Sequence, residues 1–325
     1  MILMWALVAG FLLDLRFGDP VYSFHPVRLM GQGISQAEHL LRRAVKSEKL
    51  AGAILAFSIP AVVFCLSAGF LFLLGKIHFW LAWSASIFGI YSAISIRDMK
   101  TEALRVYRHL VKNDLEKTRR DLARIVGRDT AHLDEMESIR ACVETVAEST
   151  VDGIVAPLFY AALGGVPLAL AYKAVNTLDS MIGHTNERYR LFGYAAAKQD
   201  AFWNWLPARI SYLTIAVGAL FFNARFSEAL FAGWQDGVSE ASAVSAIPEA
   251  TFAGALGLRL GGASSYAGEI VQKPYLGFAV KDLDRDDIIR SVRLMKHTAW
   301  VTLVLLLPLS WLAEVWYGPY LFWNL

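Results

Sequence analysis

Carboxylate side chains recur at helical spacing beside strongly apolar stretches of this sequence. Glu144, Glu148 and Asp152 follow one another every four residues, so a helix over 138–152 places them on one face together with Arg140. Three carboxylates in one stripe repel one another unless a cation lies among them. Because Mg²⁺ prefers carboxylate and phosphate oxygens, two of these acids and a nucleotide phosphate would satisfy it. The alternative is an exposed acidic stripe whose charge Arg140 relieves.

A second group of residues has the chemistry of a phosphate site. Gly127, Arg128, Asp129 and Thr130 form a predicted turn whose backbone amides would face an anion. The guanidinium of Arg128 adds a planar pair of donors that fits a phosphate. A motif of four residues is weak evidence by itself.

Polar residues also lie next to two further apolar stretches. On a helix, Lys173 and Asn176 point the same way and Asp179 lies beside them. These side chains either bind a ligand or satisfy one another at a helix junction. Asp200 and Asn204 lie one helical turn apart and precede an apolar helix.

Three remaining places have weaker signals. Arg209 enters an apolar stretch, where an arginine usually extends its charged end to the membrane surface. Asp19, His25 and Arg28 belong to a proline-containing loop, and His25 alone indicates no role. The segment 261–269 is predicted to be a flexible glycine-rich loop whose amides could approach a ligand.

The elements that position these residues must include membrane spans. Hydrophobic residues make up 56% of the chain and charged residues 18%, values outside the usual range of soluble proteins. The stretch Met1 to Leu13 is interpreted as a retained first helix. The two cysteines, Cys65 and Cys142, indicate neither a disulfide framework nor a cysteine-based metal site.

Length and the absence of charge identify the candidate spans, since crossing the hydrocarbon takes about 20 helical residues. They are Ala51–Gly75, Phe79–Ile96, Thr298–Tyr317 and Leu206–Phe222. The apolar stretch Ile154–Ala171 is interrupted by Gly164, Gly165 and Pro167, so we expect two half-helices in a re-entrant hairpin.

Basic residues give the orientation. Lysines and arginines cluster in 42–49 and from Arg97 to Arg128, whereas the turn between the first two spans has only Lys76. The positive-inside rule then puts both basic segments in the cytosol. We expect an all-α, polytopic integral membrane protein with one domain over 1–325, in which residues 97–150 form a cytosolic segment of amphipathic helices.

Taken together, these motifs resemble the adenosylcobinamide-phosphate synthases of cobalamin biosynthesis, the CobD/CbiB family, over nearly the whole chain. The matching segments are Asp14-Leu15, Gly18-Asp19-Pro20, His25-Pro26-Val27-Arg28, Ile125 to Thr130, Arg140, Glu144 to Glu148, Asp152-Gly153, Ala156 to Phe159, Lys173 to Met181, Asn204, Pro207-Ala208-Arg209, Leu260-Gly261-Gly262, Tyr266, Gly268 and Lys273 to Gly277.

The resemblance implies an inner-membrane enzyme of bacteria or archaea, with its active site facing the cytoplasm, that uses ATP and Mg²⁺. Its reaction would join the carboxylate of adenosylcobyric acid to aminopropanol or its phosphate, and later cobalamin-assembly enzymes at the membrane are possible partners. Membrane lipid is a further expected partner, and nucleic acid is not.

The residues that match the family motifs receive hypothetical roles. Catalysis is assigned to Glu148, Lys173, Asp179 and Asp200, with one of the two aspartates acting on the amine. Metal binding is assigned to Glu144, Glu148 and Asp152. Nucleotide binding is assigned to Arg128, Asp129, Thr130, Asn176, Arg209, Gly261, Gly262 and Tyr266, with Lys173 also on phosphate. Other substrate contacts are assigned to Asp19, His25, Arg28 and Asn204.

The sequence also departs from the family pattern. Ser149 stands where the family usually has Asn, Ala201 where it has a second aspartate, and Lys198 where it tends to have Arg. A polar loop of the family is replaced by Glu240 to Val244. This loss favours one alternative, a membrane-bound regulatory homologue without turnover. A transporter is a second and less favoured alternative, suggested by the break at Gly164 to Pro167 and by ionisable groups near the membrane.

Overall fold

The computed structural model describes residues 2–18, 25–184, 186–222, 224–238, 244–266 and 268–317. Its chain divides into two compact units. The first comprises Met1–Ser95, Ala156–Trp205 and Leu303–Leu325, and the second comprises Ile96–Val155 and Leu206–Thr302. The predicted segment 97–150 lies wholly within the second unit. A single domain over 1–325 stays a prediction.

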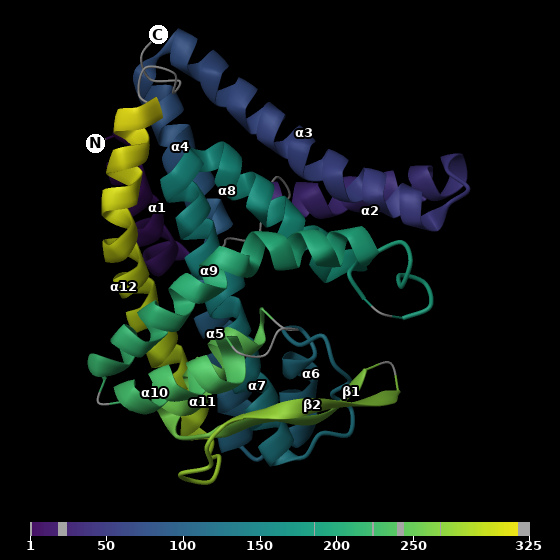
Figure 1. Ribbon diagram of the computed structural model, residues 1–325, viewed down its shortest axis with the longest axis vertical. Coiled ribbons are helices and arrows are strands. Elements are labelled where there is room, and N and C mark those ends of the chain that lie inside the picture. The colour runs from purple at the N-terminus through teal and green to yellow at the C-terminus, as the bar shows by residue number, and fades with distance from the viewer. Residues whose placement is uncertain are drawn as a thin grey trace. The chain divides into compact units, whose positions relative to one another are not determined.

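The first unit is built from helices alone in its described residues (Figure 1). They are α1 (Ile2–Phe17), α2 (Pro26–Ala44), α3 (Glu48–Ile77), α4 (Phe79–Ala93), α8 (Ala156–Ile182), the start of α9 (Tyr194–Leu220) and the end of α12 (Asp286–Tyr317). Ile34, Leu55, Leu178 and Phe192 are fully buried in one core cluster. Burying each such side chain contributes about 1.5–3 kcal/mol, so this cluster holds α2, α3 and α8 together.

Among the residues that the structure describes, four helical stretches are long and apolar enough to cross a membrane: Glu48–Ile77, Phe79–Val111, Glu135–Ile182 and Asp286–Trp316. The predicted spans Ala51–Gly75 and Phe79–Ile96 lie within the first two of these stretches. The predicted span Thr298–Tyr317 lies within the fourth, apart from Tyr317. The prediction of a span over Leu206–Phe222 is wrong by this measure. Helix α9 ends at Leu220, and its apolar part is shortened by Arg209.

The expected interruption of the apolar stretch 154–171 is present. Helix α8 leaves helical geometry at Gly164 and Gly165, and the φ of Gly165 is +65°. Residues with a side chain rarely adopt this conformation, so the glycine permits the kink. Pro167 stands two residues after Gly165 and cannot donate a backbone hydrogen bond to the preceding turn. Helix α8 is therefore two helical segments joined at a break.

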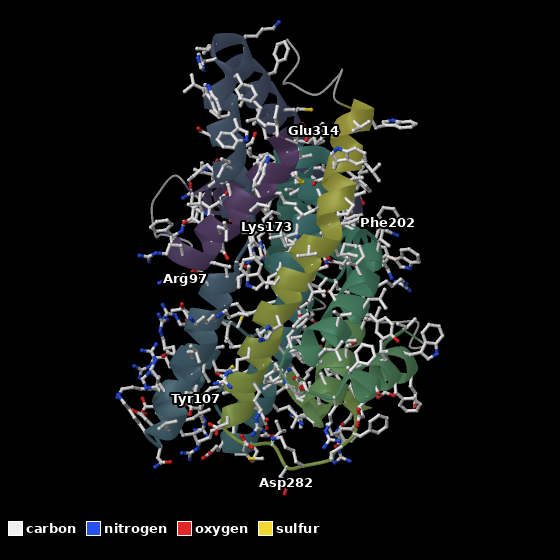
Figure 2. All side chains as sticks on the ribbon, turned by 90° about the vertical axis from the view of Figure 1, so that its left-hand side faces the viewer. Arg97, Tyr107, Lys173, Phe202, Asp282 and Glu314 are labelled. Atoms are coloured by element: carbon white, nitrogen blue, oxygen red, sulfur yellow. The ribbon has the colours of Figure 1, made fainter. Side chains whose placement is uncertain are left out.

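The first turn of α1 is capped by a distant acid. The backbone amides of Ile2 and Leu3 donate to the two carboxylate oxygens of Glu314 on α12, at 2.8 and 3.3 Å (Figure 2). The first amides of a helix have no partner within the helix, and such groups are costly to leave unpaired in an apolar environment. Glu314 thus fixes the start of α1 against the end of α12 within the first unit.

The second unit combines helices with one β-hairpin. Its elements are α5 (Ile96–Val111), α6 (Leu115–Leu122), α7 (Glu135–Thr150), a π-helical turn Val151–Val155, the end of α9, α10 (Phe226–Ala232), a second π-helical segment Gly233–Val238, α11 (Ala246–Leu256), β1 (Arg259–Tyr266), β2 (Glu269–Gly277) and the start of α12.

The hairpin corrects the prediction of a glycine-rich loop over 261–269. Strands β1 and β2 pair antiparallel from Leu260 opposite Leu276 to Tyr266 opposite Glu269, with a bulge between Gly261 and Gly262. A bulge lets an extra residue enter a strand and often requires glycine. Most of the predicted loop is therefore strand, although the fold is otherwise helical as expected.

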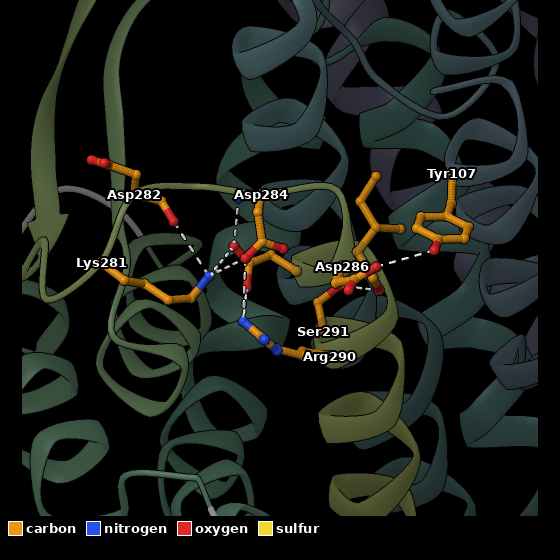
Figure 3. A network of polar contacts seen from close by, with 9 residues as sticks. Tyr107, Lys281, Asp282, Asp284, Asp286, Arg290 and Ser291 are labelled. Atoms are coloured by element: carbon orange, nitrogen blue, oxygen red, sulfur yellow. Dashed lines mark hydrogen bonds and ion pairs between the residues drawn. The ribbon is translucent and has the colours of Figure 1, made fainter. Parts of the chain in front are cut away.

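A polar network fixes the start of α12 in the second unit (Figure 3). The fully buried Asp287 accepts hydrogen bonds from the Lys281 ammonium at 2.5 Å, the Asp284 amide at 2.9 Å and the Arg290 guanidinium at 3.0 Å. On another side of this helix start, the Tyr107 hydroxyl lies 3.1 Å from a carboxylate oxygen of Asp286. A buried carboxylate is costly unless it has such partners. Since two of the partners, Lys281 and Asp284, precede α12, the network joins the segment after β2 to this helix.

Candidate active site

Glu144 is the centre of a buried polar cluster in the second unit. One of its oxygens accepts the backbone N–H of Gly261 at 2.8 Å, and the other accepts a hydrogen bond from the guanidinium of Arg128. The side chains of Arg128 and Glu144 are only 8% and 2% exposed. Burial, the largest single effect, would lower the pKa of Arg128. The charge of Glu144, its hydrogen bond to Arg128 and the smaller contributions of Tyr266 and Glu148 together outweigh burial, so the pKa is raised. Arg128 is therefore a fixed cation in this cluster.

The helix that carries the predicted acidic stripe is α7. It begins at a capping box, in which Asp134 accepts the Glu137 amide and the Glu137 side chain accepts the Asp134 amide. Arg140 lies one turn before Glu144, and its guanidinium donates to the Ala263 carbonyl of β1 at 2.8 Å. The face of α7 that carries Arg140 and Glu144 therefore packs against the hairpin. At Glu144 the predicted acidic stripe is buried, which excludes an exposed acidic face there.

Glu148 faces another acid that the sequence did not indicate as functional. Glu249 of α11 is 4% exposed and shares a hydrogen bond with Glu148. Burial raises the pKa of Glu249 well above its ordinary value, and the nearby charges of Glu148 and Glu144 raise it further. Two carboxyl groups at hydrogen-bonding distance are most stable with one proton between them.

Lys273 of β2 supplies a second cation beside this acid pair. Burial would lower the pKa of Lys273, but the charge of Glu249 and a hydrogen bond to Tyr266 outweigh burial, so the pKa is raised. Its ammonium also lies 5.6 Å from the centre of the Tyr266 ring. The cluster therefore brings together acids from α7 and α11 and a cation from the hairpin.

The other residues of the predicted phosphate turn bind parts of the protein. A carboxylate oxygen of Asp129 accepts the Ser265 hydroxyl at 2.7 Å and the Gly268 amide at 2.8 Å, and the Asp129 amide donates to the Ser265 carbonyl. The Thr130 hydroxyl donates to the Arg119 carbonyl at 3.0 Å. This turn anchors the end of the hairpin, and its role in nucleotide binding stays a prediction.

The predicted metal ligands are not equally available. Both oxygens of Glu144 are engaged, whereas Glu148 and Asp152 are half-buried side chains. Over the described ranges of the chain, no group of three or more His, Cys, Asp or Glu is arranged to hold a metal ion. Mg²⁺ often takes one or two carboxylates and completes its shell with water and substrate phosphate. Because the protein already holds both oxygens of Glu144, this residue fits that requirement less well. Metal binding by Glu148 and Asp152 stays a prediction.

A second polar group belongs to the first unit. The buried Tyr172 donates its hydroxyl proton to the Asn204 carbonyl oxygen at 2.8 Å, and the Asn204 amide donates to Asp200 at 2.9 Å. Tyr160 stacks on Tyr172 with ring centres 5.1 Å apart, and its ring centre lies 4.9 Å from that of Trp203. Asn204 is thus a positioning group for Asp200, held by an aromatic stack.

The other sequence candidates of α8 lie along the same helix. Lys173, Asn176 and Asp179 are half-buried. Their spacing of three residues places them along one side of α8, and that side is only partly covered. The carbonyl of Asp179 accepts the Gly183 amide at 2.7 Å at the end of α8. These residues belong to the first unit, and Arg128 and Glu148 belong to the second.

The remaining candidates are dispersed. His25 is buried just before α2 and Arg28 is exposed in its first turn, both in the first unit. Arg209 is half-buried in the part of α9 that belongs to the second unit. Asp19 lies outside the described residues, as do Glu240 to Ala243 of the departing loop.

The fold and the site define a polytopic membrane protein that is helical apart from one hairpin, and that carries a buried cluster of acids and cations in its hairpin-bearing unit. The CobD/Cbib protein family model matches residues 7–295, so the chain belongs to this family.

Curated relatives agree over nearly their full lengths. The chain is 43% identical to the cobalamin biosynthesis protein CobD of Klebsiella pneumoniae, covering 92% of this chain and 94% of the relative. It is 42% identical to the cobalamin biosynthesis protein CbiB of Salmonella typhimurium, covering 94% and 96%. No solved structure matches the chain.

Proposed function

We propose that this chain, whose family membership supports a role in cobalamin biosynthesis, is an ATP-dependent amide synthase. Its substrates would be adenosylcobyric acid and (R)-1-amino-2-propanol or the O-phosphate of that amine, and its product adenosylcobinamide or its phosphate. The names of the relatives support the pathway. The pair formed by the half-buried Glu148 and the buried Glu249, beside Lys273, is the observation that carries the chemistry.

An amide does not form from a carboxylate and an amine at neutral pH without activation. In the proposed reaction a carboxylate oxygen of the corrinoid attacks the terminal phosphorus of ATP, and ADP leaves. The amine nitrogen then attacks the carbonyl carbon of the acyl phosphate, and inorganic phosphate leaves as the amide bond forms. The amine, which is an ammonium ion at neutral pH, must lose one proton before the attack and a second as the amide forms, and the amide nitrogen keeps the third.

The buried cluster has the groups that these steps need. An acid pair that holds one proton has a carboxylate oxygen left to accept another from an ammonium group. Lys273 and Arg128 provide positive charge at which phosphate oxygens are stabilised. Magnesium, when bound with the nucleotide, supplies further neutralisation of phosphate charge, and Glu148 and Asp152 are the residues that would hold it.

Further roles are proposed for residues of the first unit by themselves. Lys173 is proposed to bind phosphate, and Asp179 or Asp200 to bind the amine. The basic residues of 42–49 and 97–128 favour a cytoplasmic position for the site in a multi-pass inner-membrane protein.

The proposal is tested by incubating the purified full chain with adenosylcobyric acid and each amine, with and without ATP. We expect a corrinoid amide and ADP only when acid, amine and ATP are all present. The Glu148→Gln variant should lose at least about a hundredfold of the product rate, the lower range for general acid–base groups. Glu116→Gln is the matched control, because this side chain is 84% exposed on α6.

Two results would contradict the proposal. Binding of the corrinoid without ATP consumption would favour the regulatory homologue, and a fully active, folded Glu148→Gln variant would remove the role of the acid pair.

A further inference from the structure

A groove with one cationic end and one apolar end lies in the first unit. It is formed by the first turns of α3 and α9 and has a volume of about 430 Å³. Lys49, Ala53 and Phe57 line it from α3, and Tyr194, Lys198 and Phe202 line it from α9. None of these six residues belongs to the proposed catalytic cluster.

Two lysines share one aromatic ring at the cationic end. The ammonium groups of Lys49 and Lys198 lie 5.3 and 5.8 Å from the centre of the Tyr194 ring. Within the part of the chain that the structure describes, neither lysine forms an ion pair with a carboxylate. Two like charges around one ring repel each other, and an anion placed between them removes that repulsion.

The apolar end lies farther along both helices. Phe57 follows Lys49 by eight residues, which is about 12 Å along a helix. Phe57 and Phe202 are 64% and 78% exposed, and Phe202 lies at the outer edge of the ribbon in Figure 2. Along both α3 and α9, the groove therefore changes from charged to apolar toward the C-terminal end of the helix.

The length of α3 places this change at a membrane surface. Its 30 residues extend about 45 Å, the thickness of a bilayer with its headgroup layers. Only 11% of its most apolar window is buried within the protein, so most of this window is exposed or only partly covered. Lys49 in the first turn then lies at headgroup depth, and Phe57 lies among the acyl chains.

The groove also contains an acceptor that lacks a donor. The side-chain oxygen of Gln199, which lines the groove from α9, is buried and has no hydrogen-bond partner among the described residues. A buried acceptor of this kind costs free energy unless a donor reaches it. A lipid hydroxyl would reach this oxygen only after the Gln199 side chain turns toward the groove.

We propose that this groove binds an anionic phospholipid. The lipid phosphate lies between Lys49 and Lys198, and its acyl chain runs over Phe57 and Phe202. A soluble anion would leave the apolar end uncovered, and a zwitterionic lipid would bring its own positive charge to the two lysines. The charge and depth of the groove therefore select an anionic lipid of the adjacent leaflet.

The test measures lipid binding to the purified full chain in detergent. Phosphatidylglycerol and phosphatidylcholine with identical acyl chains are titrated, and bound lipid is counted by native mass spectrometry. Each lysine near an anionic headgroup contributes roughly fivefold in affinity. We therefore expect wild-type protein to prefer phosphatidylglycerol and the Lys49→Gln/Lys198→Gln variant to lose on the order of twentyfold of that affinity.

The matched control is Lys76→Gln, at the opposite end of α3. Lys76 also lies over an aromatic ring, 5.5 Å from the centre of Phe72, and should not contribute to this preference. The Lys49→Arg/Lys198→Arg variant keeps both charges and should keep the preference. If the double glutamine variant fails to fold, the single variants should each lose about fivefold.

Several outcomes overturn the lipid assignment. The first is equal binding of the two lipids by wild-type protein. The second is a loss of phosphatidylglycerol affinity in the Lys76→Gln control as large as that in the double glutamine variant. The third is single or double glutamine variants that bind phosphatidylglycerol as tightly as the wild type does. Competition by inorganic phosphate at the lipid's own concentration would assign the lysines to a soluble anion. Displacement of bound lipid by the corrinoid substrate would assign the groove to that substrate.

Discussion

At the scale of single residues, Glu144 connects three parts of the second unit. It receives the guanidinium of Arg128, the amide of Gly261 and, at 3.9 Å, the Nε of Arg140. A buried carboxylate with these partners is stable, but removal of one cation leaves an uncompensated buried charge. Glu144 therefore holds the cluster together, in addition to the negative charge that it brings to the site.

Arg128→Ala should strongly destabilise the second unit. Breaking a buried ion pair by removing one partner costs about 3–5 kcal/mol. Unfolding of the purified protein, followed by far-UV circular dichroism, measures this loss. Arg120→Ala is the control, because its pair with Glu116 is exposed and such pairs contribute about 0–1 kcal/mol. Equal stability of the two variants would contradict the structural role of Arg128.

Glu249 should make stability depend on pH. Its folded pKa is raised, so between the ordinary value of 4.5 and the raised value the folded state holds more protons than the unfolded state. The free energy of unfolding therefore falls as the pH increases from 4.5 through the folded pKa. Glu249→Gln should fold and show a flatter profile in this window.

Thermal unfolding midpoints between pH 4.5 and about pH 8 test this prediction. The exposed Glu116→Gln variant should keep the wild-type slope. An unchanged slope in Glu249→Gln would show that another group controls the pH dependence.

At the scale of elements, the β-hairpin is the part that completes the cluster. It supplies the Gly261 amide to Glu144, the Ala263 carbonyl to Arg140 and the Lys273 ammonium to the acid pair. Its bulge turns the Gly261 amide toward α7, with a φ of +81° at that glycine. A side chain at this position would have its Cβ 2.1 Å from the Pro274 carbonyl oxygen.

Gly261→Ala should therefore disrupt the hairpin. The variant combines a backbone conformation that costs about 1–2 kcal/mol for an L-residue with a clash against fixed backbone. Gly268→Ala is the matched control, since its φ is +84° but its Cβ would meet nothing within 4 Å. Limited proteolysis should cut the hairpin of Gly261→Ala faster than that of Gly268→Ala. Identical cleavage rates would exclude a role for the close approach to Pro274.

At the scale of the whole molecule, the apolar stretches and basic segments determine membrane topology. The short turn between α3 and α4 should face away from the cytoplasm, because basic residues concentrate on the other ends of these helices. The segment that carries α5 and α6 should face the cytoplasm.

Cysteine labelling tests this orientation. With Cys65 and Cys142 replaced by serine, Ile77→Cys should react with a membrane-impermeant maleimide in intact spheroplasts. Glu116→Cys should react only after lysis. Both positions are well exposed, at 71% for Ile77 and 84% for the Glu116 side chain. The opposite labelling pattern would invert the proposed location of the site.

The sequence by itself determined the helices and the membrane character of this protein, because these depend on neighbouring residues. Apolar runs predicted α3 and α4, four-residue spacing placed Glu144 and Glu148 on one face of α7, and Gly164 with Pro167 located the break in α8. Only the tertiary structure revealed that Glu249 faces Glu148, that Lys273 neutralises the pair and that Gly261 belongs to a strand bulge. Glu148 and Glu249 lie more than a hundred positions apart in the chain, and no local periodicity records which distant side chains meet.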